Sequence, residues 1–404
     1  MTREIFWLPL LIPTTSFLLL FLMKRQQRSL LPGPKKLPLI GNLHQLGGCL
    51  PHISLERLSN EYGPLMFLQL GSVPTLVISS ADVARDIFKS HDVILSGRPD
   101  LYAVNKFGYG CKNISFAPYG EYWREVRKIA ILELLSSKRV QSFQAVRDEE
   151  VELMLQYIAQ SSGPINLSRL TIGASRFESL MRETQAMLGS SSIADFFPWM
   201  EWVNKFNGRN TSLEKYFREL DNLLDDEIQE HHDLKRPKSE HEDLVDVLLR
   251  VQKDSSQVIA LTNDHIKAVL NDIFFAGTDT SSAMLTWTMT ELVRNSSAMK
   301  RAQNEVREIV KGKDKVDEED LSKLMYLKLV LKEALRIHPP APLLVPRVTT
   351  QDCSLIPFGV GRRGCPGVKL PAGMRSEDLD MEEAFGITMH KKTHLCLVAT
   401  PASL

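Results

Sequence analysis

The sequence predicts a mainly α fold with small β-sheets, and three observations support this prediction. Most of the 404-residue chain carries apolar residues at spacings of three and four, the period of an amphipathic helix. A strand-like pattern stands out near the start of the chain, bounded by turn-forming residues. Hydrophobic residues make up 43% of the chain, which is enough to bury a core, so disorder is not expected.

The first predicted element of the globular part is a β-hairpin. Apolar runs at 66–70 and 75–78 flank the turn-forming sequence Gly71-Ser72-Val73-Pro74. The charged stretch 235–242 is predicted to be a solvated loop. Helical periodicity covers six stretches, namely 81–89, 119–135, 140–159, 213–232, 244–253 and 262–292.

The N-terminal region differs from the rest of the chain. Residues 5–23 are apolar almost without interruption, close to the ~20 residues that cross a bilayer. Lys24, Arg25 and Arg28 follow, which favours a cytosolic location for that side. A cleaved signal peptide, the alternative, would carry its charges before the apolar run. We therefore predict a membrane anchor at 1–29, a proline-rich hinge at 30–38 and a globular domain at 39–404.

Charge and cysteine content exclude several classes of protein. The formal net charge is zero, which argues against nucleic acid as a partner. The five cysteines are scattered and lack paired spacing. This pattern fits a reducing compartment rather than a disulfide framework or a zinc cluster.

The long helix predicted at 262–292 can be capped by Thr262 or Asn263. It has polar residues in the middle of an apolar sequence, at Ala276-Gly277-Thr278-Asp279-Thr280-Ser281. A glycine there costs about 1 kcal/mol, and a buried carboxylate costs more unless it is paired. Such inconsistency often marks a functional site. Ala276 and Gly277 would let a flat cofactor approach the backbone, and Thr280 could bind its own helix carbonyl or a bound oxygen. Taken alone, a polar kink explains the stretch equally well.

The glycine-rich loop at 357–367 holds a single cysteine, Cys365. Glycines permit tight turns, so that several backbone N–H groups can point at one sulfur. Arg362 and Arg363 favour the thiolate over the thiol. Pro366 suits the first turn of a helix, whose positive end would stabilise the thiolate further. The loop therefore predicts a thiolate metal ligand, against the alternative of a structural cysteine in a turn.

Two pairs of helical residues are weaker candidates. Trp123 and Arg127 lie four residues apart on one helix face, where an indole N–H and a guanidinium could bind a carboxylate. A core tryptophan beside a surface arginine is the commoner explanation. Glu333 and Arg336 form an i, i+3 pair of a kind common on surface helices.

In this order along the chain, these motifs resemble the cytochrome P-450 family. The pattern Phe358-x-x-Gly361-x-Arg363-x-Cys365-x-Gly367 is similar to its haem-binding loop, and the resemblance spans nearly the whole chain. Segments such as Phe116-Ala117-Pro118-Tyr119-Gly120 are similar to the plant microsomal group that oxidises specialised metabolites.

The resemblance implies a cytochrome P-450 fold that holds haem b, iron protoporphyrin IX, through the Cys365 thiolate as axial iron ligand. It implies an acid–alcohol pair in Asp279 and Thr280, and a structural brace in Glu333 and Arg336. Arg98 resembles a basic residue that some members direct at the haem edge, against the alternative of a solvent-facing arginine. The other residues implied to bind the cofactor are Phe358, Gly361, Arg363, Gly367, Trp123, Arg127, Ala276, Gly277 and Arg347.

The resemblance also implies partners and a location. It implies NADPH- and O2-dependent hydroxylation of a small apolar plant metabolite, with electrons from NADPH-cytochrome P-450 reductase. Arg124 and Lys128 would contribute to a basic surface for that reductase. The chain would lie on the endoplasmic reticulum membrane through its single N-terminal anchor, with the catalytic domain in the cytosol.

The chain departs from the family pattern in three places. The stretch between Arg336 and Cys365 is too short for the family's meander, whose arginine completes the Glu333–Arg336 brace. Pro371 and Gly373 interrupt the expected helix after the cysteine. A helix near 170–177 is shortened. These gaps predict weak or absent haem binding, and leave open a catalytically inactive, haem-poor membrane protein of the same descent. A peroxide-rearranging member is less consistent with the intact Asp279-Thr280 pair.

Overall fold

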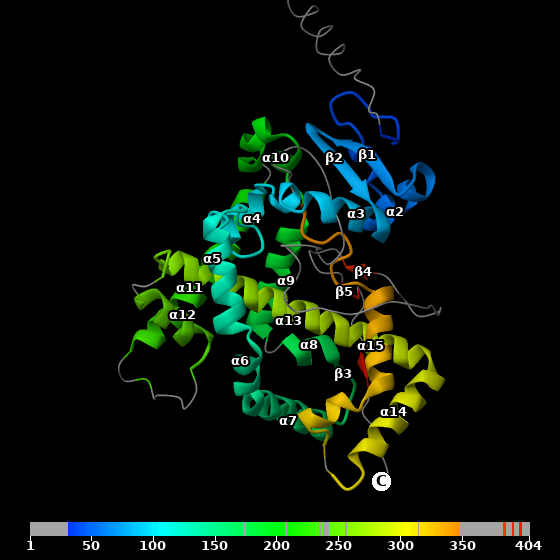
Figure 1. Ribbon diagram of the computed structural model, residues 1–404, viewed down its shortest axis with the longest axis vertical. Coiled ribbons are helices and arrows are strands. Elements are labelled where there is room, and N and C mark those ends of the chain that lie inside the picture. The colour runs from blue at the N-terminus through cyan, green and yellow to red at the C-terminus, as the bar shows by residue number, and fades with distance from the viewer. Residues whose placement is uncertain are drawn as a thin grey trace, which may run out of the picture.

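The computed structural model describes residues 31–172, 175–206, 208–233, 236, 242–254, 257–313, 315–347, 383–384, 390–391 and 396–397. Within these ranges the fold is mainly α with small antiparallel sheets, which confirms the predicted class (Figure 1). The predicted anchor at 1–29 lies outside the described residues. No helix of the described part is long and apolar enough to cross a membrane.

The helices follow one another as α2 (Pro51–Tyr62), α3 (Ala81–His91), α4 (Tyr102–Phe107), α5 (Glu121–Ile129), α6 (Ser137–Ser142), α7 (Gln144–Gln160), α8 (Leu167–Ile172), α9 (Ser175–Gly189), α10 (Ile193–Phe196), α11 (Arg209–His232), α12 (Leu244–Lys253), α13 (Asn263–Arg294), α14 (Ser296–Val310) and α15 (Met325–Ile337). Short 3₁₀ turns are η1 (Leu43–Gln45), η2 (Ile94–Ser96), η4 (Pro198–Lys205) and η5 (Glu318–Ser322), and a π-helical turn is η3 (Ala130–Leu134).

The predicted hairpin is present. Strands β1 (Leu65–Leu70) and β2 (Val73–Ile78) pair antiparallel, and Gly71 makes the turn with a positive φ of 60°. Side chains alternate between the two faces, so α2 packs on one face and α3 on the other. The remaining strands form two-residue pairs, β3 (Ile165–Asn166) with β6 (Cys396–Leu397) and β4 (Glu383–Ala384) with β5 (His390–Lys391).

Two predicted helices are divided in the structure. The helix predicted at 119–135 begins only at Glu121, because Gly120 is extended, and its last turn widens into η3. The helix predicted at 140–159 becomes α6 and α7, which are separated where Phe143 leaves helical geometry with ψ 11°. The sequence period continues across both breaks, so periodicity alone could not locate them.

The long helix α13 organises the core. It contacts α8, α11, α12, α14 and α15, and it crosses the molecule in Figure 1. Thr262 caps it as predicted, with its hydroxyl accepting the His265 N–H. The main hydrophobic cluster lies between α13 and helices α4, α5, α9, α11 and α12.

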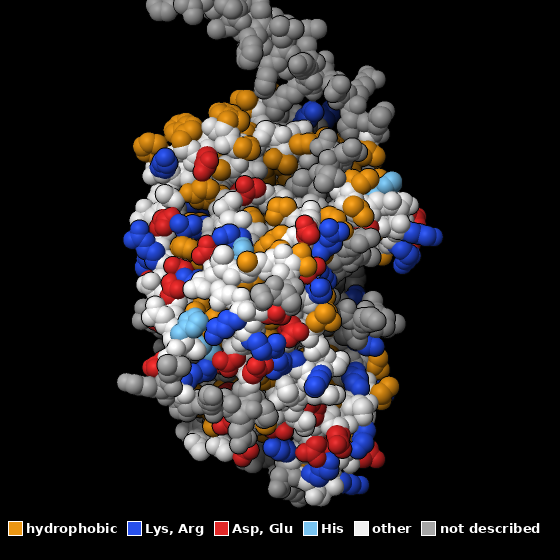
Figure 2. Space-filling view, turned by 60° about the vertical axis from the view of Figure 1, so that its left-hand side comes forward, with side chains coloured by type: hydrophobic (Ala, Val, Ile, Leu, Met, Phe, Trp, Pro, Cys, Tyr) orange, Lys and Arg blue, Asp and Glu red, His pale blue; other side chains and the backbone are white. Residues whose placement is uncertain are grey.

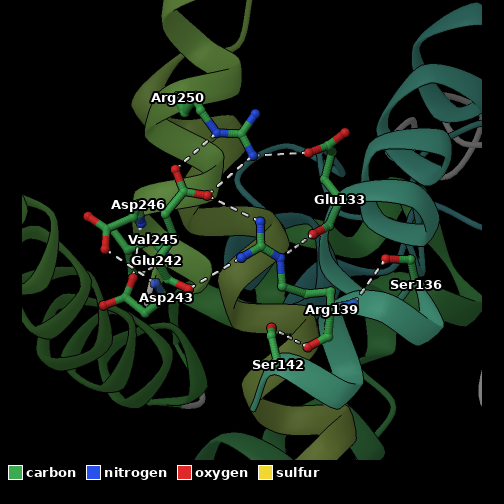
Figure 3. Close-up of polar contacts among 9 residues, drawn as sticks. All are labelled: Glu133, Ser136, Arg139, Ser142, Glu242, Asp243, Val245, Asp246 and Arg250. Carbon is green, nitrogen blue, oxygen red and sulfur yellow. Dashed lines mark hydrogen bonds and ion pairs between the residues drawn. The ribbon is translucent and has the colours of Figure 1, made fainter. Parts of the chain in front are cut away.

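Charged side chains join the end of α5 to the start of α12 (Figure 3). Glu242 lies between two guanidinium groups, with Arg250 at 3.2 Å and Arg139 at 3.2 Å. Arg250 also contacts Glu133 of η3 at 3.1 Å. These pairs are partly exposed, so each contributes at most about 1 kcal/mol, but together they fix η3, α6 and α12 relative to one another. Glu242 was predicted to lie in a solvated loop, but its side chain also connects Arg139 of α6 to Arg250 of α12.

A buried histidine connects α11 to the same end of α12. The Nε2 atom of His231 lies 2.7 Å from Oδ2 of Asp243, the N-cap residue of α12, and Nδ1 lies 2.7 Å from the Glu227 carbonyl oxygen. Arg236 contacts the same Asp243 oxygen at 3.0 Å. Burial lowers the pKa of His231, but the hydrogen bonds to Asp243 and Glu227 outweigh it, and the net pKa is raised.

We expect the free energy of unfolding to depend on the protonation of His231. Because its folded pKa is raised, the stabilisation is fully present below the unfolded pKa and is lost as pH rises through the folded pKa. Denaturant unfolding at several pH values above about 6.5 should therefore show a decline in the parent chain that His231→Gln lacks. The neighbouring exposed His232→Gln variant is the matched control and should keep the decline. An unchanged profile in His231→Gln would contradict this assignment.

Candidate functional site

The polar stretch of α13 lies in an unbroken helix. Asp279 is 4% exposed, whereas Ala276 and Gly277 are exposed. The Thr280 hydroxyl donates to the Ala276 carbonyl at 2.6 Å, one of the two interactions predicted for it. Helical geometry continues through the stretch to Arg294, so a kink does not account for these residues.

One face of α13, here called the open stripe, is exposed to solvent beside the polar stretch 276–281. Phe274 and Leu285 are 39% and 45% exposed, and Gly277 lies between them on the same face. A Cβ atom added at Gly277 would meet no atom of the described residues within 4 Å. Small and apolar side chains on an otherwise buried helix therefore leave room for a flat group against its backbone.

Trp123 and Arg127 both lie on α5, as predicted. The 3% exposed indole donates its Nε1–H to the Ile114 carbonyl at 2.9 Å, and its predicted use on a cofactor carboxylate stays a prediction. The Arg127 guanidinium lies 5.3 Å from the centre of the indole ring. The segment before α5 folds back over the indole and brings Ile114 within reach. Binding of a cofactor carboxylate by Trp123 and Arg127 stays a prediction.

Arg98 is not a solvent-facing arginine. Its Nε donates to the Ser115 carbonyl at 2.8 Å, and one terminal nitrogen donates to the carbonyls of Val345 and Pro346, both at 2.8 Å. The guanidinium thus connects the segment before α5 to the segment after α15. The planar group suits several acceptors at once, which a lysine could not match.

Arg347 is buried at 7% exposure, on the side of α3. Its guanidinium lies 4.5 Å from the centre of the Phe88 ring and 4.0 Å from Asp92, and it donates to the Leu95 carbonyl at 3.4 Å. Burial lowers the pKa of Arg347, with Asp92 opposing this shift. Arg98 and Arg347 are brought together through the 345–347 segment.

Glu333 and Arg336 form a two-point ion pair on α15. Arg336 Nε and a terminal nitrogen bind the two Glu333 carboxylate oxygens at 3.0 and 2.8 Å. Both side chains keep about a third or less of their surface exposed, at 27% and 30%. The hydrogen bonds to Glu333 raise the pKa of Arg336.

The residues predicted to surround the cysteine lie outside the described part of the chain. These residues are Phe358, Gly361, Arg363, Cys365 and Gly367. Their roles stay predictions.

Asp272 on α13 was not among the residues predicted from the sequence. Its side chain contacts the segment before α5. Its carboxylate accepts from Asn113 and from the Ser115 N–H, both at 2.8 Å. The available signal was a second acidic residue seven positions before Asp279, a spacing that returns to nearly the same helix face.

A family model decides what the chain is. The model described as Cytochrome P450 matches residues 31–172 and 166–356. The chain belongs to the cytochrome P450 family. Its enzymes are haem-dependent monooxygenases, and their cofactor is iron protoporphyrin IX.

Relatives and solved structures agree with this membership. The chain is 52% identical to "Cytochrome P450 71A9" of Glycine max, over 93% of this chain and 94% of that protein. It is 47% identical to "Strychnine-11-hydroxylase" of Strychnos nux-vomica, over 92% of this chain and 91% of that protein. These plant relatives confirm the specialised-metabolism group. A zebrafish cytochrome P450 solved with abiraterone shares the fold, with a TM-score of 0.65 and 24% identity over 87% of this chain and 100% of that chain.

The chain is a shortened member of the family. Its alignment with the Glycine max protein spans 470 positions, more than the 404 residues of this chain, so gaps open within it. The family match also divides between 166 and 172, beside the predicted short helix near 170–177. Despite the gap, α8 contacts α13, where Thr171 and Ser282 hydroxyls lie 2.6 Å apart.

The open stripe of α13 fits the cofactor of this family. Haem is flat and needs close approach to a helix backbone. Ala276 and Gly277 offer that approach, and the space beside Gly277 is open.

We expect Arg98→Gln to destabilise the fold, because three carbonyl groups lose a charged donor. The loss should be about 1–3 kcal/mol in the free energy of unfolding. The control is Arg85→Gln, which breaks an exposed ion pair to Asp82 and should cost less than about 1 kcal/mol. Equal effects of the two variants in denaturant unfolding would show that the Arg98 contacts contribute nothing.

Proposed function

We propose that the chain is a haem-thiolate monooxygenase that uses NADPH and O2 to hydroxylate a small apolar plant specialised metabolite. The observation that carries this proposal is the polar centre of α13. There, α13 keeps the buried acid Asp279 and the hydroxyl of Thr280, although the chain is shortened. Two small exposed residues, Ala276 and Gly277, lie beside them. The similarity to Strychnine-11-hydroxylase of Strychnos nux-vomica supports the reaction class, since that relative is a hydroxylase.

Bound haem would supply thiolate-ligated iron, which favours cleavage of the O–O bond. The protein would supply the surroundings. Ala276 and Gly277 let the cofactor lie close to α13. The Thr280 hydroxyl donates to the Ala276 carbonyl at this face, and it would form an acid–alcohol pair with the buried Asp279 side chain beside it.

Cys365 would provide the axial iron ligand, with Phe358, Gly361, Arg363 and Gly367 shaping its loop. Arg127 on α5, whose guanidinium lies beside the Trp123 ring, would bind a haem carboxylate together with Trp123. Arg98 and Arg347 bind backbone carbonyls of the surrounding protein, so their contribution would be to fix the 345–347 segment. Glu333 and Arg336 would brace α15.

Two regions of the surface would bind partners, one a reductase and the other a membrane. Arg124 and Lys128 are exposed on α5 and would form part of a basic surface for NADPH-cytochrome P-450 reductase. Hydrophobic side chains gather at the top of the molecule in Figure 2, the end at which Figure 1 places the hairpin and α10. There, Trp199, Trp202 and Phe206 are 67%, 56% and 81% exposed. Such a patch would rest on the endoplasmic reticulum membrane, with the catalytic domain in the cytosol.

A second candidate is an inactive, haem-poor membrane protein. The observation that favours it is the shortening itself, because the alignment gaps and the missing meander arginine remove support around Cys365 and the Glu333–Arg336 pair. The two candidates differ in one measurable property, the thiolate-ligated iron.

We expect the reduced, carbon-monoxide-bound chain to show the red-shifted Soret band of a haem-thiolate protein. The band should vanish in Cys365→Ala, because the alanine cannot ligate iron. Cys111→Ala is a control at a partly buried cysteine in the described part of the chain, and it should keep the band. Absence of the band from the parent chain would favour the inactive candidate, and its persistence in Cys365→Ala would exclude this ligand.

We expect Trp199 and Trp202 to contact lipid. On vesicles that contain brominated lipid, tryptophan fluorescence should be quenched, and Trp199→Ser/Trp202→Ser should lose a clear share of that quenching. Trp287→Phe, at 0% exposure, is the matched control and should preserve it. Quenching that is unchanged in the double variant would place this patch away from the membrane.

A further inference from the structure

Asp272 of α13 uses both carboxylate oxygens to bind one short segment. Oδ1 accepts from the Asn113 side-chain amide at 2.8 Å, and Oδ2 accepts the Ser115 N–H at 2.8 Å. Burial raises the pKa of Asp272, and the donors on residues 113–115 oppose this shift. The carboxylate lies seven residues, about two helical turns, before Asp279.

The segment 113–116 is bound from several elements at once. The Ile114 carbonyl accepts from Trp123 of α5, and the Ser115 carbonyl accepts from Arg98, which reaches on to residues 345 and 346. Asp272 is the residue of this set that lies on α13. It therefore connects the helix that carries Thr280 to both of the other elements.

The approach to this segment has unfavourable backbone geometry. Tyr109, Gly110 and Cys111 have φ values of 53°, 76° and 55°, in the left-handed region that non-glycine residues rarely adopt. Such residues persist where surrounding contacts hold them. Asn271 of α13 donates to the Phe107 carbonyl at 2.9 Å, before this stretch. The contact between Lys112 and Asp264 of α13, at 2.9 Å, is exposed to solvent and contributes little.

We propose that Asp272 is a positioning residue, which fixes segment 113–116 against α13 and thereby sets the placement of Arg98 and Trp123 beside the polar centre of the helix. The inference rests on the proposed function for its meaning, because the substrate would lie at that centre. The contact itself can be measured without haem.

The two side chains allow a test by exchange of their groups. Asp272→Asn alone would turn an amide N–H2 group toward the Asn113 amide. Asn113→Asp alone would turn two carboxylates toward each other. In the double variant, the amide introduced at position 272 can donate to the carboxylate introduced at position 113, while the amide oxygen still accepts the Ser115 N–H. Among the described residues the Asn113 Oδ1 atom accepts no hydrogen bond, so we expect a partial recovery.

The experiment is hydrogen–deuterium exchange on the full chain, followed in peptides that cover 113–117. Each single variant should exchange about tenfold faster there, as the loss of hydrogen bonds to a charged group predicts. The double variant should recover part of the protection and exchange more slowly than either single variant. Asp264→Asn, which breaks only the exposed contact to Lys112, is the matched control and should stay close to the parent.

Unchanged exchange in Asp272→Asn would overturn the proposal. A double variant that is no better protected than the single variants would also overturn it, including the case in which the single variants unfold.

A second readout uses the haem-loaded chain. Asp272→Asn should leave the dissociation constant of imidazole unchanged and shift that of 4-phenylimidazole severalfold, because only the bulky ligand reaches the displaced segment. Equal shifts for both ligands would contradict a positioning role. A chain without any Soret band would instead count against the proposed function and would leave the exchange result standing.

Discussion

Polar groups within a buried helix must find partners, and this requirement on α13 determines much of the structure around it. Asp272, Ser282 and Thr286 each bind a side chain or backbone group of another segment. The segment before α5 is held on one side and α8 on another. The centre of the helix, with Ala276 and Gly277 exposed, then remains as the place where a cofactor can lie.

The same requirement explains how a shortened chain keeps its framework. Helix α8 has only the residues Leu167–Ile172, yet its hydroxyl groups still meet those of α13, with Ser168 and Thr286 3.2 Å apart. The cost of an unpaired buried hydroxyl is comparable to a lost hydrogen bond, about 1–3 kcal/mol. Packing against α13 therefore stabilises the shortened segment, because its hydroxyl groups stay paired there. The Glu333–Arg336 pair likewise satisfies itself on α15, because each carboxylate oxygen meets a guanidinium nitrogen.

The sequence was sufficient for features with a local signal. The period, the Thr262 cap and the polar centre of α13 all lie within one stretch of chain, and so do the hairpin and its turn. It was insufficient for contacts between distant residues. Arg98 and Arg347 bind carbonyl groups about 250 positions away along the chain, and the Trp123 indole donates to the Ile114 carbonyl of the segment before α5. No periodicity records such pairings, because they depend on how finished elements pack.

Whether the framework of α13 is enough to hold the cofactor is the central question for this chain. The most direct measurement is the haem-to-protein ratio of the purified, monodisperse 404-residue chain, determined from the pyridine haemochrome after saturation with haem and gel filtration. The gaps around Cys365 by themselves predict weak or absent haem binding. Because the α13 face and its supporting contacts are kept in the described residues, we expect binding to be retained nevertheless, with a ratio close to one haem per chain. A ratio close to zero would contradict this view and would show that the shortened segments, rather than α13, decide whether haem is held.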